Sequence, residues 1–306
     1  MTASPSSASV ESPQQSRAAH WAIPALIIGI VAISFSPIFA RLSEIGPVAT
    51  AVDRLALPLP FFWAYMLARP EREWTQKRCL LLISLAGALF AGDLAFWHWA
   101  LKFTPVADAT LLANISPVLV VALAWFLFDE RVGRVFMLGG GVAIVGMVVL
   151  VARNVELSST AILGDGLALV ASLFYAAYLL TVARIRKYVS TLALMTIGST
   201  VGAILLVPIL LASEPALWPS TLYGWLVVGG LALLGQSIGQ LLVMFAFAHV
   251  SSGLGALMLL MQPVVSAAGA WVILDEPIAP IQALGGLMIL IGLSIARRDS
   301  LATQKA

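Results

Sequence analysis

The residues that could carry chemistry are the few ionisable side chains inside long apolar runs. Asp93 lies well within the run Cys79–Leu101, and Trp97 follows one helical turn later on the same face. In a helix that crosses lipid, such a charge costs about 2.5–3.5 kcal/mol on insertion scales. Asp93 therefore either contacts a substrate amine or takes up a proton, or it is a structural carboxylate hydrogen-bonded to a neighbouring helix.

Two further ionisable groups allow similar alternatives. His98 lies about 100° around the helix from Trp97, near the end of the run. It is either an interfacial or structural histidine or a second proton-accepting group. Arg54 stands beside Asp53 near the start of the run Pro47–Leu67. It either has a structural role, bonding to a neighbouring helix or pairing with Asp53, or it grips the carboxylate of a substrate.

Polar and aromatic side chains recur at intermediate depth in several other apolar runs. They could be packing contacts worth about 1 kcal/mol or less. Their convergence from different runs instead predicts a common lined volume, and kinks at Pro37, Pro117 and Pro263 would open it. The predicted substrate-binding residues besides Asp93 and Trp97 are Ser34, Asn114, Tyr175, Tyr178, Gln236, Gln240, Met258 and Gln262.

Several chemistries are not indicated by the sequence. It has no GxxxxGK[ST] phosphate loop, no HExxH and no paired Cys-x-x-Cys. Its single cysteine, Cys79, excludes an internal disulfide framework, and a net charge of +2 is too small to suggest a nucleic-acid partner. We therefore expect no metal, no cofactor and no enzymatic activity.

The composition predicts that these residues are positioned by transmembrane helices. Only 10% of the 306 residues are charged and 60% are hydrophobic, whereas a soluble domain carries about 25% charged residues. Because about 20 apolar residues span a bilayer, the sequence predicts an all-α polytopic membrane protein with ten transmembrane helices. A signal peptide is the alternative interpretation of the first run, but 20 apolar residues are long for its hydrophobic region and the preceding tail is barely basic, so we expect a retained helix. The predicted spans are 21–40, 47–67, 79–101, 106–128, 135–152, 164–184, 191–212, 221–247, 252–274 and 278–296.

The stretch Val106–Gly146 occurs twice. At a fixed offset of 146 residues, Ser252–Gly292 lies over it without a gap. The matched positions include Pro117 with Pro263, Trp125 with Trp271, Asp129-Glu130 with Asp275-Glu276, Gly139-Gly140 with Gly285-Gly286, and Gly146 with Gly292. This agreement predicts an internal duplication: a disordered tail 1–20, a first five-helix repeat 21–152, a linker 153–163, a second repeat 164–296 and a tail 297–306.

The cations predict the orientation of the two repeats. With both termini in the cytoplasm, the cytoplasmic segments hold thirteen Lys and Arg residues: Arg17, Arg69, Arg72, Lys77, Arg78, Arg131, Arg134, Arg184, Arg186, Lys187, Arg297, Arg298 and Lys305. The other side holds three, Arg41, Lys102 and Arg153. This is a strong positive-inside bias. Because each repeat has five spans, the second must be inverted, and its corner DEPIAP has lost the arginines of DERVGR.

These motifs, including the Pro-Val pair, the Ala-Trp pair, the acidic corner and the double glycine, resemble the EamA repeat of the drug/metabolite transporter superfamily. The resemblance covers the chain after residue 20. It implies a basket of helices around a central cavity, in a bacterial inner membrane, and it is the ground for expecting export. Inverted repeats independently favour a secondary transporter with a midplane site.

An apolar, aromatic lining with few charges favours small amphipathic cargo, with aromatic and apolar amino acids first and cationic drugs or other metabolites as the alternative. A membrane-embedded enzyme or a receptor is the alternative from another class, and the duplication argues against both. The expected partners are a small-molecule substrate and the lipid bilayer. The glycine pairs would bring helices close together, either within the chain or in a homodimer.

Overall fold

Prolines set many of the helix starts and breaks. In the computed structural model, which describes residues 13–68, 76–100, 103, 112–128, 133–151, 162–186, 188–275 and 277–303, α1 (Pro13–Ser34) begins at a proline. The chain breaks at Phe35, and α2 (Ser36–Leu42) carries Pro37 in its first turn. Proline suits this position because the first amide of a helix has no intrahelical acceptor.

The second predicted span is divided in the same way. It consists of α3 (Pro47–Ala56) and α4 (Leu59–Leu67), with Leu57 and Pro58 between them. Two later helices follow a short turn and carry a proline near their start. α7 (Ser116–Phe128) follows a turn at residues 114–115, and α14 (Met261–Leu274) follows a turn at residues 259–260 that ends α13 (Ser252–Met258). Pro117 and Pro263 occupy the first turns of α7 and α14.

The other helices are mostly long and continuous. They are α5 (Lys77–Ala100), α8 (Arg134–Val151), α9 (Ile162–Ile185), α10 (Thr191–Ser213) and α15 (Pro280–Thr303). The span Leu222–Phe247 joins α11 (Leu222–Gly230), a π-helical segment η3 (Leu231–Gln240) and α12 (Leu241–Phe247). The Ser237 hydroxyl donates to the Ala232 carbonyl, five residues back, which matches π-helical spacing.

The described part of the chain is all-helical, with no strand, and it contains seven helices long and apolar enough to cross a membrane. The segments Ser116–Leu127 and Arg134–Leu150 are apolar but shorter. The expectation of a polytopic membrane protein is therefore confirmed. The transmembrane surface carries large exposed apolar side chains, as a lipid-facing surface requires; examples are Phe61, Trp125, Phe126, Trp271 and Val272.

Two helices extend past the predicted ends of the first and last spans. Residues 13–20, expected in a disordered tail, belong to α1, and residues 297–303, expected beyond the last span, continue α15. Both ends extend the adjoining helix because helical propagation adds one hydrogen bond per residue once the helix exists. Residues 1–12, most of the linker 153–163, Glu130 and Glu276 lie outside the described residues.

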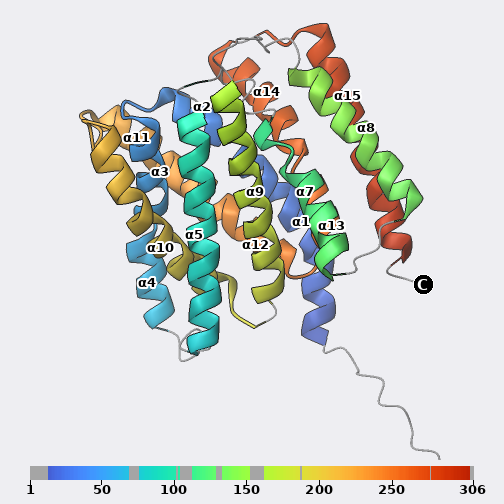
Figure 1. Ribbon diagram of the computed structural model, residues 1–306, viewed down its shortest axis with the longest axis horizontal. Helices are drawn as coiled ribbons and strands as arrows, with labels where there is room; N and C mark the ends of the chain where they lie inside the picture. The colour runs from blue at the N-terminus through green and yellow to red at the C-terminus, as the bar shows by residue number, and fades with distance from the viewer. Residues whose placement is uncertain are drawn as a thin grey trace, which may run out of the picture.

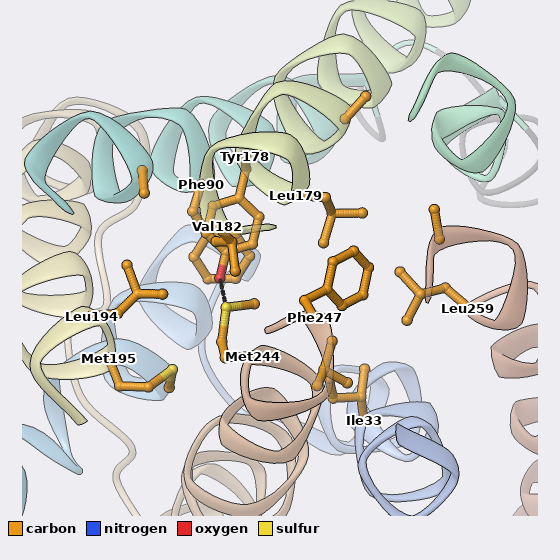
Figure 2. Close-up of a cluster of buried hydrophobic side chains, with 14 of the residues drawn as sticks. Ile33, Phe90, Tyr178, Leu179, Val182, Leu194, Met195, Met244, Phe247 and Leu259 are labelled. Carbon is orange, nitrogen blue, oxygen red and sulfur yellow. Dashed lines mark hydrogen bonds between the residues drawn. The ribbon is translucent and has the colours of Figure 1, made fainter. Parts of the chain in front are cut away.

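The core lies where α5, α9, α10 and α12 meet. Figure 2 shows Phe90, Tyr178, Met244 and Phe247 from three of these helices packed together. The rings of Phe90 and Tyr178 are stacked with centroids 4.9 Å apart. Stacked aromatic pairs of this kind add about 0.5–1.5 kcal/mol beyond their buried area, so they fix α5 against α9.

Glycines bring α8 and α15 into direct backbone contact at one edge of the bundle (Figure 1). A Cβ atom on Gly146 would lie 2.7 Å from the Gly285 carbonyl oxygen, and one on Gly139 would lie 2.6 Å from that of Gly292. The two helices therefore run antiparallel. The close approach of the fifth and tenth predicted spans occurs within the chain, so these glycines give no support to the expected homodimer interface.

Candidate functional site

A chain of side-chain hydrogen bonds crosses the middle of the bundle. Arg54 Nε on α3 donates to Gln236 Oε1 on η3 at 3.3 Å, and Gln236 Nε2 donates to Ser199 Oγ on α10 at 3.0 Å. Both Gln236 and Ser199 are buried, whereas Arg54 is half-buried. Because the Gln236 amide donates to Ser199, its carbonyl oxygen is directed at the Arg54 guanidinium.

A second polar pair follows one turn further along η3. Gln240 Nε2 donates to the Tyr178 hydroxyl at 2.8 Å, and that hydroxyl points at Met244 Sδ, 3.3 Å away (Figure 2). The Tyr175 ring lies 5.9 Å from the Tyr178 ring. The π-helical segment thus directs two glutamines to the same interior face, and π-helical turns are frequent at functional sites.

The charges of the cluster lie among aromatic rings. The Arg54 guanidinium carbon is 5.9 Å from the centroid of the Phe90 ring, within cation–π range. Asp93, one turn beyond Phe90 on α5, interacts electrostatically with Arg54, Tyr175 and Tyr178. The cluster therefore combines one cation, one carboxylate and a set of aromatic faces.

The hypothesis of a structural pair between Asp53 and Arg54 is not supported. Asp53 is buried, and its Oδ2 has no hydrogen-bond partner among the described residues. Arg54 turns instead to Gln236, because adjacent residues on a helix point about 100° apart.

The structure brings together six of the predicted site residues: Arg54, Asp93, Tyr175, Tyr178, Gln236 and Gln240. The positions of the others are as follows. The Ser34 hydroxyl donates to the Ile30 carbonyl of its own helix at 2.6 Å, and Met258 is buried in the core at the end of α13. Asn114 precedes α7, and Gln262 is in the first turn of α14. Trp97 is half-buried one turn beyond Asp93, and the His98 side chain lies outside the described residues.

Three members of the cluster were missed from the sequence: Phe90, Ser199 and Met244. Phe90 precedes Asp93 by three residues, so the shared face of α5 could have indicated it. Met244 follows Gln240 by four residues, so the shared face of that span could have indicated it as well. Ser199 carries no such signal, because only the packing of α10 against its neighbours makes it part of the cluster.

A small cavity adjoins the cluster between α5, α9, α10 and η3. Its volume is about 10 Å³, and it is lined by Ala86, Gly87, Phe90, Tyr178, Leu194, Met195, Gly198, Ser199 and Gln236. This is near the smallest space that holds one water molecule. The larger hollow, of about 270 Å³, is a groove formed by residues of α15 alone, between Leu290 and Arg298.

A bundle of apolar helices with a polar, charged cluster at its centre defines a polytopic membrane protein with an interior site. The family model of the EamA-like transporter family matches residues 20–152 and again residues 162–298. The chain therefore belongs to the EamA-like transporter family, and the resemblance noted in the sequence is confirmed.

Named relatives extend over most of the chain. A probable amino-acid metabolite efflux pump of Salmonella typhimurium is 28% identical over 285 residues, covering 88% of this chain and 92% of the relative. The pseudopaline exporter of Pseudomonas aeruginosa is 24% identical over 230 residues, covering 74% and 78%. A solved crystal structure matches with a TM-score of 0.80 at 21% identity, covering 92% of this chain and 99% of that one. This last likeness concerns the fold alone.

Proposed function

We propose that the protein is a secondary transporter that exports small amphipathic metabolites, with aromatic and apolar amino acids as its principal cargo. The observation that carries this proposal is that Arg54 and Asp93 interact electrostatically in the bundle interior, with the Arg54 guanidinium against the Phe90 ring. An amino acid is a zwitterion, so its carboxylate would bind Arg54, its ammonium group would bind Asp93, and an apolar side chain would pack on Phe90 and Tyr178.

Electrostatics favours this class of cargo. A single ionic ligand would leave one of the two protein charges without a partner in a low-dielectric interior, which is costly. A zwitterion offers both partners at once. The names of the Salmonella and Pseudomonas relatives support outward transport of amino-acid-like metabolites. Cationic drugs, the alternative cargo, would engage Asp93 but not Arg54.

We propose further that ten spans form two inverted five-helix repeats. The support is a reciprocal contact: Gly139 meets Gly292, and Gly146 meets Gly285. At the offset of 146 residues, Gly285 is the counterpart of Gly139 and Gly292 that of Gly146. Each glycine of the first half therefore meets the counterpart of the other one in the second half. A two-fold axis between the halves requires this reciprocal pattern. The packing of α5 on α9 is likewise matched by that of α1 on η3 and α12.

The repeats would give the chain its topology, with both termini in the cytoplasm, and the positive-inside bias supports that orientation. Trp125 and Trp271, equivalent at the same offset, are both exposed near the ends of α7 and α14. In inverted repeats they would anchor opposite faces of the bilayer. The cavity of about 10 Å³ is far below the roughly 300 Å³ of a small-molecule site, so the helices must separate to admit cargo.

Counterflow into proteoliposomes tests the function. Vesicles loaded with unlabelled phenylalanine are expected to accumulate labelled phenylalanine transiently, without chemical conversion, while a nucleotide sugar and a permanent organic cation compete weakly. Empty vesicles are the control. If only the organic cation drives accumulation, the cargo is a cationic drug and not an amino acid. If no compound shows counterflow, the protein is not a carrier.

A further inference from the structure

Two glutamates tie the outer ends of the two halves of the chain together. Glu214, at the end of α10, accepts hydrogen bonds from the Val48 and Ala49 amides, each at 2.9 Å, at the start of α3. Glu44, in the turn between α2 and α3, accepts from the Ser220 amide at 3.2 Å and from the Thr221 amide at 3.2 Å, at the start of α11. The Ser220 and Thr221 hydroxyls also donate to Glu44.

The arrangement is reciprocal. A carboxylate from residues 21–152 caps a helix of residues 164–296, and a carboxylate from the second set caps a helix of the first. A negative charge at a helix N-terminus satisfies free amides and is favoured by the helix dipole. The Thr221 hydroxyl bond lowers the pKa of Glu44, so this carboxylate is charged at neutral pH.

Glycines make room for both carboxylates. A side chain on Gly46 would collide with the Glu214 carboxylate, and one on Gly224 would collide with that of Glu44. Each glutamate therefore lies directly over a helix start. We call Glu44, Glu214 and the two helix starts they cap the outer clasp. It lies at the end of the bundle formed by α2, α3 and α11, opposite the beginning of α1 (Figure 1).

We propose that the outer clasp is the gate that closes the central site toward the outer face of the membrane. The bonds join segments 165–177 residues apart in the chain, so they cannot persist if the two halves separate at this end. The cluster around Arg54 lies beneath the clasp on the same helix, α3, whose first amides Glu214 holds. Opening an outward path to Arg54 therefore requires these bonds to break.

Ser36 supplies a reporter between the clasp and the site. Its Oγ is buried without a hydrogen-bond partner among the described residues, and it lies 2.7 Å from where a Cβ on Gly235 would be, a position itself 3.8 Å from Cζ of Arg54. In a Cys79→Ala background, Ser36→Cys should react slowly with a membrane-impermeant maleimide added from the outer side of spheroplasts. Glu44→Ala and Glu214→Ala are each expected to speed that labelling about tenfold.

Matched controls separate a gate from general loosening. Ser190→Ala removes an N-cap from the opposite end of α10 and should leave the labelling rate unchanged. Ala216→Cys, exposed beside the clasp, should label equally fast with and without the glutamates. Glu214→Gln keeps one acceptor oxygen and should give an intermediate rate, which preserves the test if an alanine variant does not fold.

Equal Ser36→Cys labelling in parent, Glu44→Ala and Glu214→Gln would overturn the gate, and so would equal acceleration by Ser190→Ala. The inference rests on the proposed alternating access. The two can fail separately, because the reporter measures opening without cargo, whereas counterflow measures transport.

Discussion

Replacing Arg54 by glutamine is expected to lower kcat/KM for phenylalanine export about 100-fold, corresponding to roughly 3 kcal/mol for two charge-assisted hydrogen bonds to a carboxylate. The loss should appear in initial rates of counterflow. The kcat/KM of Arg54→Lys should lie between that of the parent and that of Arg54→Gln, because lysine keeps the charge but lacks the planar guanidinium that Gln236 orients.

The specificity of the loss separates recognition from misfolding. Phenylalaninamide keeps the ring and the amine but lacks the carboxylate, so Arg54→Gln should transport it as well as the parent does. Asp93→Asn should show the opposite pattern: the rate for 3-phenylpropionate, which lacks the amine, should be retained while that for phenylalanine falls. If both variants lose all three compounds equally, Arg54 and Asp93 are structural and the zwitterion site is wrong.

Gly146→Leu is expected to destabilise the protein by about 3 kcal/mol, the upper end of the usual cost of overpacking. A Cβ there meets the Gly285 carbonyl oxygen and the Ile289 amide nitrogen, both at 2.7 Å. These are backbone atoms that cannot rotate away, so α8 and α15 must move apart. Unfolding of the purified protein in detergent, titrated with dodecyl sulfate, measures the change.

Gly141 provides the matched control on the same helix. A Cβ at Gly141 meets nothing within 4 Å, so Gly141→Leu should change the free energy of unfolding by no more than about 0.5 kcal/mol. Equal destabilisation by both substitutions would mean that the cost arises from placing a large side chain anywhere on α8. The contact between α8 and α15 would then not be needed.

The helical spans and their breaks could largely be predicted from the sequence because they depend on local chemistry. Apolar length sets the spans, and Pro37, Pro117 and Pro263 mark helix starts whatever the neighbours are. The glycines at 139, 146, 285 and 292 indicated close packing, but not which helix each would meet. Only the tertiary structure shows which helices meet, and it places these glycines in a contact between two helices of the same chain.

The polar cluster was only partly accessible to sequence reasoning for the same reason. Arg54 and Gln236 are 182 positions apart, and nothing in either segment reveals that α3 packs against η3. Ser34 looked equivalent to Gln240 at the level of sequence, yet its short hydroxyl bonds to its own helix. Glu44 and Glu214 are not indicated by any motif in the sequence, and only the folded chain places them at helix starts.

The inverted duplication is the central claim, and labelling of two equivalent corners tests it most directly. Gly133 and Ala279 precede α8 and α15 and are related by the offset of 146 residues. In a Cys79→Ala background, Gly133→Cys is expected to react with an impermeant maleimide only from the cytoplasmic side, and Ala279→Cys only from the outer side. Reaction of both cysteines from the same side would contradict inverted repeats and the alternating-access mechanism built on them.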